Sequence, residues 1–335
     1  MSNVSHGMSS ADYHALPDFG SSGLKLLQRS PLHYWSAYRD PNRKPRQATP
    51  LMRIGTAWHA AIFEPEKFAT EYTTGHDANP LTNRAKLLGQ LLTGELKPDQ
   101  LRVMPEGLSK VSKEGKALVA EIEAAGCTPV SEEDFAFVCE WEPKLRGREV
   151  LSADTMADIK AMAAAAAAHP ASYVLFQQCK GFGETSIFWT DADTGMRCKI
   201  RPDYHVPPCE LFPYGLIVDG KSIDDASPEA FARNAWNSEH HLQAAIYVDG
   251  FQSAYATAKP PPFIWLVQER DAPHATAYYS AGDDLIAYGR KQYKRLLGIA
   301  ADCERLGIWP GYPTQVQPMA LPAWAVKTVQ EGLAA

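Results

Sequence analysis

The hydrophobic and polar positions of the chain follow a helical period in its first half and a strand period in its second half. In the first half, apolar residues three and four positions apart predict a helix that ends at Arg29, with Ser21 and Ser22 as caps and Pro31 as its stop. A second helix is predicted over 52–68, where Pro65 sharpens or ends it. A polar start precedes the first helix, a proline-rich basic linker is predicted at 41–50, and residues 71–180 are predicted to be mainly helical.

From residue 181 onward, short apolar runs bounded by turn residues predict strands that alternate with two long helices. The predicted strands are 185–190, 197–205, 216–222, 263–268 and 276–280, and the predicted helices are 239–255 and 283–306. Residues 191–195 between the first two strands have the composition of a hairpin turn. This order of elements predicts an α/β fold with a mixed central sheet flanked by helices.

The same patterns divide the chain into four segments. We expect an N-terminal helical and basic part at 1–70, a mainly helical insertion at 71–180, a core with the main strands at 181–325, and a C-terminal tail at 326–335. The length of 335 residues and the 45% hydrophobic content fit a globular protein with a sizeable core, and exclude fibrous and wholly disordered proteins.

The charge of the chain is unevenly distributed. The whole chain has a net charge of −6, which argues against a protein that coats nucleic acid by bulk positive charge. Residues 24–54 nevertheless hold seven Lys and Arg residues against Asp40 alone. Such a basic segment can be a solvated face, but its interleaved aromatic rings favour a channel that follows phosphates and stacks on bases. The predicted nucleic-acid contacts are Arg43, Lys44, Arg46, Arg53, Tyr34 and Trp35.

The six cysteines show no CxxC pair and no regular spacing, so we expect buried reduced thiols rather than a zinc site or a disulfide framework. The first twenty residues lack a basic stretch followed by an apolar one, and the longest apolar run, 161–168, is far shorter than the roughly 18–20 residues of a membrane span. We therefore expect a cytoplasmic protein without a membrane partner.

A short charged motif closes the apolar run that forms the third predicted strand. In Asp219-Gly220-Lys221, the two charged residues are two positions apart and project from the same strand face. A buried carboxylate and amine can pair with each other or serve a metal and a reacting group. Asp203, with fifteen intervening residues, lies in the neighbouring predicted strand and can bring a second carboxylate beside Asp219. Two such carboxylates favour a hard cation such as Mg²⁺.

Together with two flanking motifs, this pattern resembles the PD-(D/E)xK nuclease superfamily, and within it the RecB-like branch. That branch carries GxxxH before the core and QxxxY after it, which here are Gly55 to His59 and Gln243 to Tyr247. The missing side chain of Gly55 is expected to let backbones approach near His59. The segments 20–70 and 180–325 are further similar to the nuclease domain of RecE-type exodeoxyribonucleases (exodeoxyribonuclease VIII).

The resemblance implies a restriction-endonuclease-like fold, with the nuclease core at 181–325 and the GxxxH motif in the N-terminal part. It implies that His59, Asp203, Asp219 and the carbonyl of Gly220 hold one or two Mg²⁺ ions, for which Mn²⁺ can substitute. Three further residues are implied to be catalytic or supporting: Lys221, Gln243 and Tyr247. Glu184 is either a further acidic member of the site or an exposed carboxylate at the start of a strand. Because only Cys303 follows the QxxxY motif, no iron-sulfur cluster is expected.

The function implied is that of a Mg²⁺-dependent exodeoxyribonuclease that degrades one strand of linear duplex DNA from 5′ to 3′. Its partners would be DNA ends, a RecT-like single-strand annealing protein of phage or prophage recombination in a bacterial host, and further copies of itself in a ring-shaped oligomer. Two alternatives remain open at this stage. One is a DNA-end-binding recombination scaffold that does not cut, and the other is an endonuclease of the same superfamily.

Overall fold

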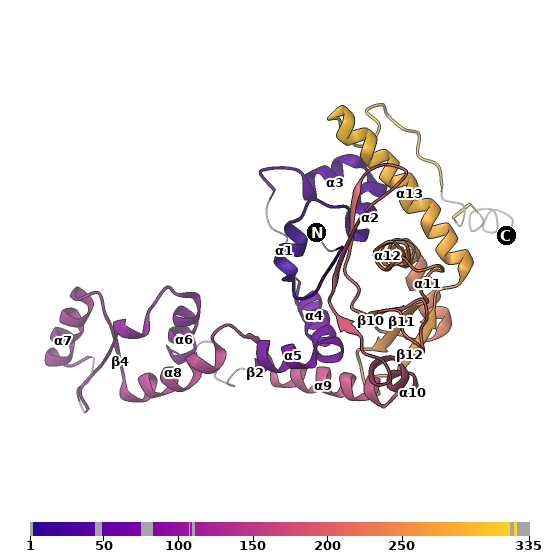
Figure 1. The fold of residues 1–335 in the computed structure, drawn as a ribbon. Helices are drawn as coiled ribbons and strands as arrows, with labels where there is room; N and C mark the ends of the chain where they lie inside the picture. The colour runs from indigo at the N-terminus through magenta and orange to yellow at the C-terminus, as the bar shows by residue number, and fades with distance from the viewer. Residues whose placement is uncertain are drawn as a thin grey trace, which may run out of the picture.

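A five-stranded mixed sheet runs through the centre of the body, in the order β12, β11, β10, β9, β6 (Figure 1). We describe it from a computed structural model, which covers residues 3–43, 49–74, 83–106, 108, 111–321 and 325–326. The strands of this sheet are β6 (Phe182–Gly183), β9 (Tyr204–Val206), β10 (Leu216–Ile223), β11 (Phe263–Glu269) and β12 (Thr276–Ser280). The predicted mixed sheet is therefore confirmed.

The central strand β10 is parallel to β11 and antiparallel to β9. The parallel pair requires a crossover, which α11 (Pro228–Asn237) and α12 (His240–Tyr255) supply. Side chains of β10 alternate between two hydrophobic layers: Ile217 packs toward α12, and Val218 packs toward the opposite face. Both are fully buried, so β10 is covered on both sides.

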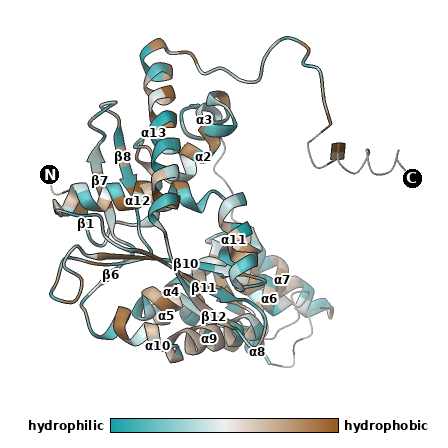
Figure 2. Cartoon of the chain, turned by 90° about the vertical axis from the view of Figure 1, so that its right-hand side faces the viewer, coloured by the Kyte–Doolittle hydropathy of each residue, from teal (hydrophilic) through white to brown (hydrophobic). Residues whose placement is uncertain are grey.

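Helices cover the two faces of this sheet. On one face lie α4 (Pro50–Phe63) and α9 (Ala153–Ala168), whose Trp58 and Met162 pack with Val218 and Leu266. On the other face lies α12, crossed by α13 (Asp283–Leu306), as Figure 2 shows from the side. The predicted helices 239–255 and 283–306 agree with α12 and α13. Because α9 lies on the sheet, the last part of the predicted insertion contributes to the body.

A second sheet of three strands lies beside the first, in the order β1 (Val4–Ser5), β7 (Ser186–Thr190), β8 (Arg197–Ile200). The hairpin β7–β8 turns where the composition predicted it. The prediction of one continuous strand over 197–205 is wrong, because this segment divides into β8 in the small sheet and β9 in the large one. Pro202 has no N–H to donate to a ladder, and the backbone bends at Asp203 between the two strands.

Three short helices form the N-terminal part: α1 (Ser10–Ala15), α2 (Ser21–Arg29) and α3 (Pro31–Tyr38). Of these, α2 packs against α12 and α13, and α3 packs against α13. Ser30 ends α2 and caps α3, accepting a hydrogen bond from the backbone N–H of His33. The helix predicted over 52–68 is two helices, α4 and α5 (Pro65–Glu71), because Pro65 cannot continue α4 and instead occupies the first turn of α5.

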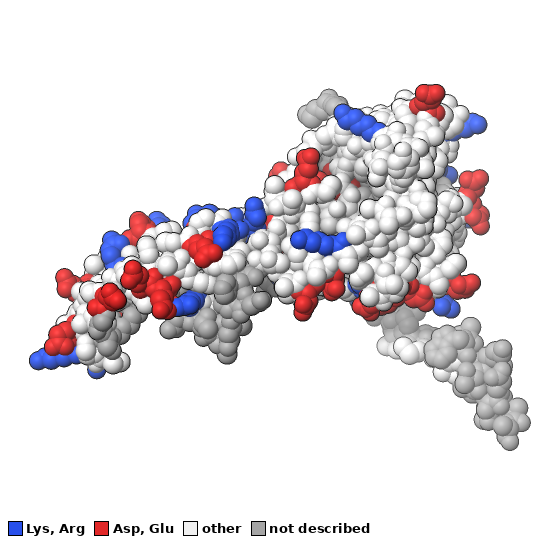
Figure 3. All heavy atoms as spheres, turned by 90° about the horizontal axis from the view of Figure 1, so that it is seen from below, with Lys and Arg blue, Asp and Glu red and all other residues white. Residues whose placement is uncertain are grey.

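An arm with its own small hydrophobic core projects from the body (Figure 1). Its elements are α6 (Asn83–Thr93), a 3₁₀ turn (Pro98–Gln100), β3 (Leu101–Val103), α7 (Lys113–Ala124), β4 (Thr128–Val130) and α8 (Glu132–Leu145). The paired strands β2 (Tyr72–Thr74) and β5 (Glu149–Leu151) join it to the body, and after α9 come α10 (Pro170–Ser172) and a π-helical turn (Tyr173–Gln177). Among the described side chains on the face drawn in Figure 3, acidic and basic groups are mixed along the arm without a continuous basic stripe.

The cysteines match the expectation only in part. All six are free thiols, but only Cys198 and Cys303 are buried, and Cys139 is exposed. In the part of the chain that the structure describes, no helix combines the length and the apolar character needed to cross a membrane.

Close contact between α12 and α13 depends on a glycine. A Cβ atom on Gly289 would lie 2.1 Å from the backbone carbonyl oxygen of His241, which cannot move aside without shifting α12. We expect Gly289→Ala to lower the free energy of unfolding by about 2–3 kcal/mol. Gly298→Ala in the same helix is the control, because a Cβ there meets nothing within 4 Å and alanine favours the helix. Thermal unfolding of both variants checks this, and equal midpoints would contradict it.

Candidate active site

The two predicted catalytic aspartates lie opposite each other at the junction of β9 and β10. Tyr204 pairs with Val218 in the antiparallel register, so Asp203 comes opposite Asp219, one position further along. The backbone N–H of Gly220 donates to Asp203 Oδ2 over 2.7 Å and fixes this carboxylate against the catalytic strand. The sequence placed Asp203 inside a strand, whereas it lies in the bend before β9. From this bend the Asp203 side chain lines the cleft while one carboxylate oxygen stays bonded to β10.

Asp219 is buried and holds two partners. Its Oδ2 accepts a hydrogen bond from the Lys221 ammonium, and its Oδ1 accepts one from Gln243 Nε2 over 2.7 Å. Burial raises the pKa of Asp219 above its usual value, although the charge of Lys221 opposes this. The Lys221 ammonium also faces the carbonyl oxygen of Gly220 at 3.4 Å. A positive charge is thus held between two of the predicted metal ligands, which marks this position as favourable for a cation.

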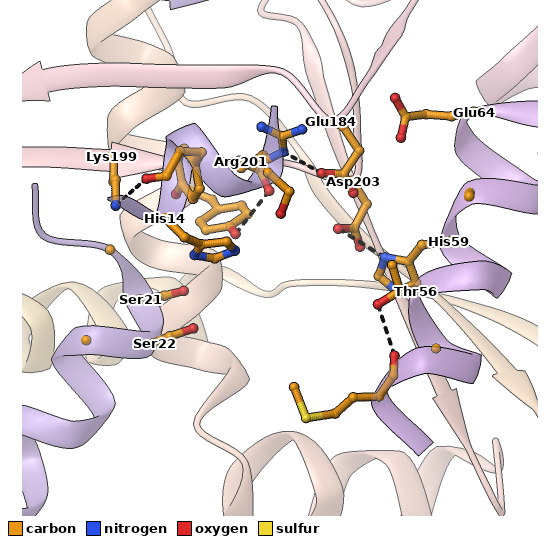
Figure 4. A pocket seen from close by; sticks show the side chains of 18 of the residues that line it. His14, Ser21, Ser22, Thr56, His59, Glu64, Glu184, Lys199, Arg201 and Asp203 are labelled. Atoms are coloured by element: carbon orange, nitrogen blue, oxygen red, sulfur yellow. Dashed lines mark hydrogen bonds and ion pairs between the residues drawn. The ribbon is translucent and has the colours of Figure 1, made fainter. Parts of the chain in front are cut away.

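Three predicted residues from different elements meet in a single acidic cluster. His59 from α4, Glu184 from the turn before β7 and Asp203 place ligand atoms within 4.8 Å of one another. Figure 4 shows His59 and Asp203 pointing toward each other, with Nδ1 and Oδ1 3.4 Å apart. Burial opposes the charge on both groups, but their attraction outweighs it, so the pKa of His59 is raised and the pKa of Asp203 is lowered.

Glu184 is held in place by an unusual backbone and by a buried arginine. Its φ of 48° lies in the left-handed region, which is uncommon for a residue other than glycine. Arg201 Nε donates to Glu184 Oε2 over 2.5 Å, and its other donors reach the carbonyl oxygen of Met8 at 3.0 Å and Ser186 Oγ at 3.1 Å. Burial, followed by the neighbouring charge of Asp203, raises the pKa of Glu184. Glu184 is therefore part of the acidic cluster, and the alternative of an exposed carboxylate at the start of a strand is wrong.

Arg201 is a site residue that sequence reasoning missed. It orients Glu184, and its backbone carbonyl accepts a hydrogen bond from the hydroxyl of Tyr247 over 3.2 Å. Arg201 lies two residues before Asp203 in the sequence. This position was a signal, because carboxylates in a buried site need a positively charged partner. The contacts of Gln243 and Tyr247 go to Asp219 and Arg201, so these two residues of the QxxxY motif support the site itself.

The acidic cluster opens into a cleft of about 560 Å³ between α4 and the N-terminal helices. Gly55 lines this cleft, and a Cβ on it would meet nothing within 4 Å, so the expectation that Gly55 lets backbones approach is wrong. Its missing side chain leaves room in the cleft beside His59 instead. The opposite wall includes Ser21 and Ser22 at the start of α2 (Figure 4).

Aromatic side chains of α4 lie directly against the backbone of Gly220. A Cβ there would lie 2.8 Å from Phe63 and 3.0 Å from Trp58, both on α4. The glycine of the Asp-Gly-Lys motif therefore lets α4 pack onto β10, which brings His59 to the level of Asp203. Trp58 Nε1 also donates to Gln268 Oε1 on β11 over 2.6 Å, which fixes α4 further.

The residues predicted to contact nucleic acid differ in their exposure and in their partners. Tyr34 is only 2% exposed and stacks on Phe19, so it is a core residue, and the prediction that it stacks on a base is wrong. Arg53 is exposed but forms an ion pair with Glu149 over 2.6 Å. Arg43 is exposed, and Trp35 is partly exposed. Lys44 and Arg46 lie outside the described residues.

The cluster fits a divalent metal. One imidazole and two carboxylates offer nitrogen and oxygen donors of the kind that Mg²⁺ and Mn²⁺ accept in proteins. The lowered pKa of Asp203 keeps it ionised for this purpose. Asp219 and the Gly220 carbonyl were predicted as ligands as well, but both face Lys221. Asp219 would have to give up one of its hydrogen-bond partners to bind a metal. Glu184 takes the third position in the cluster.

Comparison with known proteins places this geometry in a family. A family described as "PDDEXK-like domain of unknown function" (DUF3799) matches residues 130–320, more than half of the chain. The chain belongs to this family. The restriction-endonuclease-like fold expected from the motifs is thereby confirmed, and the PDDEXK-like family supports a nuclease. The DUF3799 match begins within the predicted insertion and includes α9, in keeping with the packing of this helix on the central sheet.

Two solved structures are similar to this PDDEXK-like chain. One comes from Eubacterium rectale and is provisionally named an exonuclease; it is 11% identical, with a TM-score of 0.42 and coverage of 96% of this chain and 98% of the other. The second, SSO0001, is 13% identical, with a TM-score of 0.26 and coverage of 63% and 85%. A search of curated proteins finds no significant match.

Proposed function

We propose that this protein is a Mg²⁺-dependent exodeoxyribonuclease that hydrolyses one strand of linear duplex DNA from 5′ to 3′. The observation that carries the proposal is the meeting of His59, Glu184 and Asp203 beside the Asp219–Lys221 pair, at the edge of an open cleft. Phosphodiester hydrolysis needs an activated water and positive charge near the phosphate, and both requirements match this set of groups.

The proposed role of each residue follows from its position in the site. When bound, a divalent cation supplies positive charge against the phosphate and lowers the pKa of a water. Lys221 forms an ion pair with Asp219. As an ammonium it orients the attacking water or stabilises the pentavalent phosphorus, and as a neutral amine it would take the proton of that water. Gln243 holds Asp219 in the orientation that presents it to Lys221. Arg201 holds Glu184 in the cluster.

The proposal includes the partners that the RecE-type resemblance implies. These are DNA ends as substrate, a ring of identical copies around the duplex, and a single-strand annealing protein that takes up the product strand. The polarity and these partners rest on that resemblance, while the hydrolysis itself rests on the site.

Linear and covalently closed circular forms of one plasmid test the exonuclease proposal. With Mg²⁺, we expect the linear duplex to lose one strand from each end as mononucleotides and short products and to leave single-stranded DNA, while closed circles stay intact. EDTA should stop the degradation. Cutting of closed circles would favour the endonuclease alternative, and tight binding to DNA ends without degradation would favour the non-cutting scaffold.

A further inference from the structure

Two large aromatic rings are exposed on the surface outside the cleft. Trp236, in the last turn of α11, is 60% exposed, and Tyr288, in the second turn of α13, is 49% exposed. Their ring centroids are 5.4 Å apart with the planes inclined by 27°. The two helices lie on the face that Figure 2 turns toward the viewer. Isolated exposed rings are common, but two exposed rings in contact form a larger apolar patch on the surface.

The pair is held rigidly from beneath. The buried ring of His241 lies 5.1 Å from Trp236 and 5.3 Å from Tyr288, measured between centroids. His241 Nε2 and Gln292 Oε1 lie 2.7 Å apart, at hydrogen-bonding distance, which fixes the imidazole between α12 and α13. Because both residues are highly exposed despite this contact, a large part of each remains open to solvent. Ligand binding would therefore cost little ordering of the protein.

Cationic side chains surround the pair at helical spacing. Arg233 precedes Trp236 by three residues, Lys291 follows Tyr288 by three, and Arg295 lies one turn beyond. All three are exposed, and within the described part of the chain none of them forms an ion pair. Carboxylates lie on the same helices, with Glu229 one turn before Arg233 and Asp284 one turn before Tyr288. Glu239 at the start of α12 accepts from Gln28.

This surface adjoins the catalytic strand. Lys25 on α2 donates to the carbonyl oxygen of Ser238, two residues after Trp236, over 2.5 Å. Burial, followed by the nearby charge of Lys221, lowers the pKa of Lys25 to about 8, so the same amine lies near the catalytic pair. The first turn of α12 makes the same connection, because His241 supports the rings and Gln243 holds Asp219.

We propose that Trp236 and Tyr288 bind single-stranded DNA by stacking on its bases, with Arg233, Lys291 and Arg295 facing the phosphates. Unpaired bases expose faces that stack on aromatic rings, whereas duplex bases cover theirs with one another. Exposed cations that form no ion pair in the described part of the chain fit the phosphate backbone. This inference goes beyond the proposed function, and binding at this surface requires neither metal nor cleavage.

Fluorescence anisotropy with labelled oligothymidine, in EDTA and at low salt, tests the proposal on the full-length protein. We expect Trp236→Ala and Tyr288→Ala each to weaken binding about ten-fold, and Trp236→Phe to retain most of it. Tyr173→Ala is the matched control, because Tyr173 is 54% exposed on a different surface, and it should bind like the wild type. Arg233→Gln with Lys291→Gln should flatten the dependence of log Kd on log salt by roughly 1.4, or about 0.7 for each lost contact.

Three outcomes would overturn the proposal. The first is binding by Trp236→Ala and Tyr288→Ala within two-fold of the wild type. The second is no binding by the wild type itself. The third is a changed molecular mass of these variants in solution with unchanged oligothymidine binding, which would make the surface a protein interface. The binding assay in EDTA does not depend on cleavage. Failure of the nuclease assay would therefore not affect the binding result, and failure of the binding assay would not affect the nuclease result.

Discussion

Asp203→Asn is expected to reduce the rate of DNA hydrolysis by roughly a thousand-fold or more. Asp203 is the residue that connects the parts of the site, since it faces His59, accepts from the Gly220 backbone and lies opposite Asp219. The amide keeps the shape of the side chain but removes the negative charge that a divalent cation requires. Affinity for Mn²⁺, measured by calorimetry, should therefore fall together with the rate.

A matched control distinguishes the loss of the Asp203 charge from a general effect of an amide substitution in the cleft. Glu71→Gln is the matched control, because Glu71 lines the same cleft and is exposed, yet lies outside the acidic cluster. Its rate and metal affinity should stay close to those of the wild type. A wild-type rate in Asp203→Asn, with the protein folded and the metal still bound, would remove Asp203 from the site.

Lys221→Met is expected to reduce the rate of hydrolysis by roughly 10²- to 10⁴-fold while the protein still binds Mn²⁺ and DNA. The methionine keeps much of the side-chain stem and loses the ammonium that acts on water or on the phosphorus. Because Asp219 is buried, the loss of its cation raises the pKa of Asp219 further and lowers the stability of the fold. Binding Mn²⁺ in place of the ammonium should restore part of this stability.

Rate and metal affinity, measured on the same preparations, distinguish the two predictions. Asp203→Asn should lose both, whereas Lys221→Met should lose only the rate. Loss of metal binding in Lys221→Met would mean that the lysine shapes the metal site, and an unchanged rate would mean that it has no part in the chemistry.

Much of the scaffold could be predicted from the sequence because local patterns determine it. The period of apolar residues located β10, α12 and α13. The spacing of Asp219 and Lys221 predicted that they share one strand face, where the structure pairs them. The register of β9 against β10 then brought Asp203 opposite Asp219, as the pattern of two neighbouring strands implied.

Features that depend on distant contacts were not predictable in the same way. The break at Pro202 separates two sheets, and only the fold decides which strand joins which sheet. Tyr34 sits in an aromatic sequence that favours a binding surface, but packing against Phe19 places it in the core. The left-handed backbone of Glu184 and its hold by Arg201 likewise arise from contacts across the body.

The roles of the site residues remain predictions, as do the divisions of the chain at 70, 180 and 325. The structure brings His59, Glu184 and Asp203 together in one cluster.

Digestion of end-labelled linear duplex DNA in Mg²⁺, Mn²⁺ and EDTA, with the wild type and Lys221→Ala side by side, tests the central claim most directly. We expect the wild type to degrade the duplex with either metal and not in EDTA, and Lys221→Ala to leave it intact. Equal degradation by both proteins, or none by the wild type with either metal, would contradict the assignment of this site as a metal-dependent nuclease.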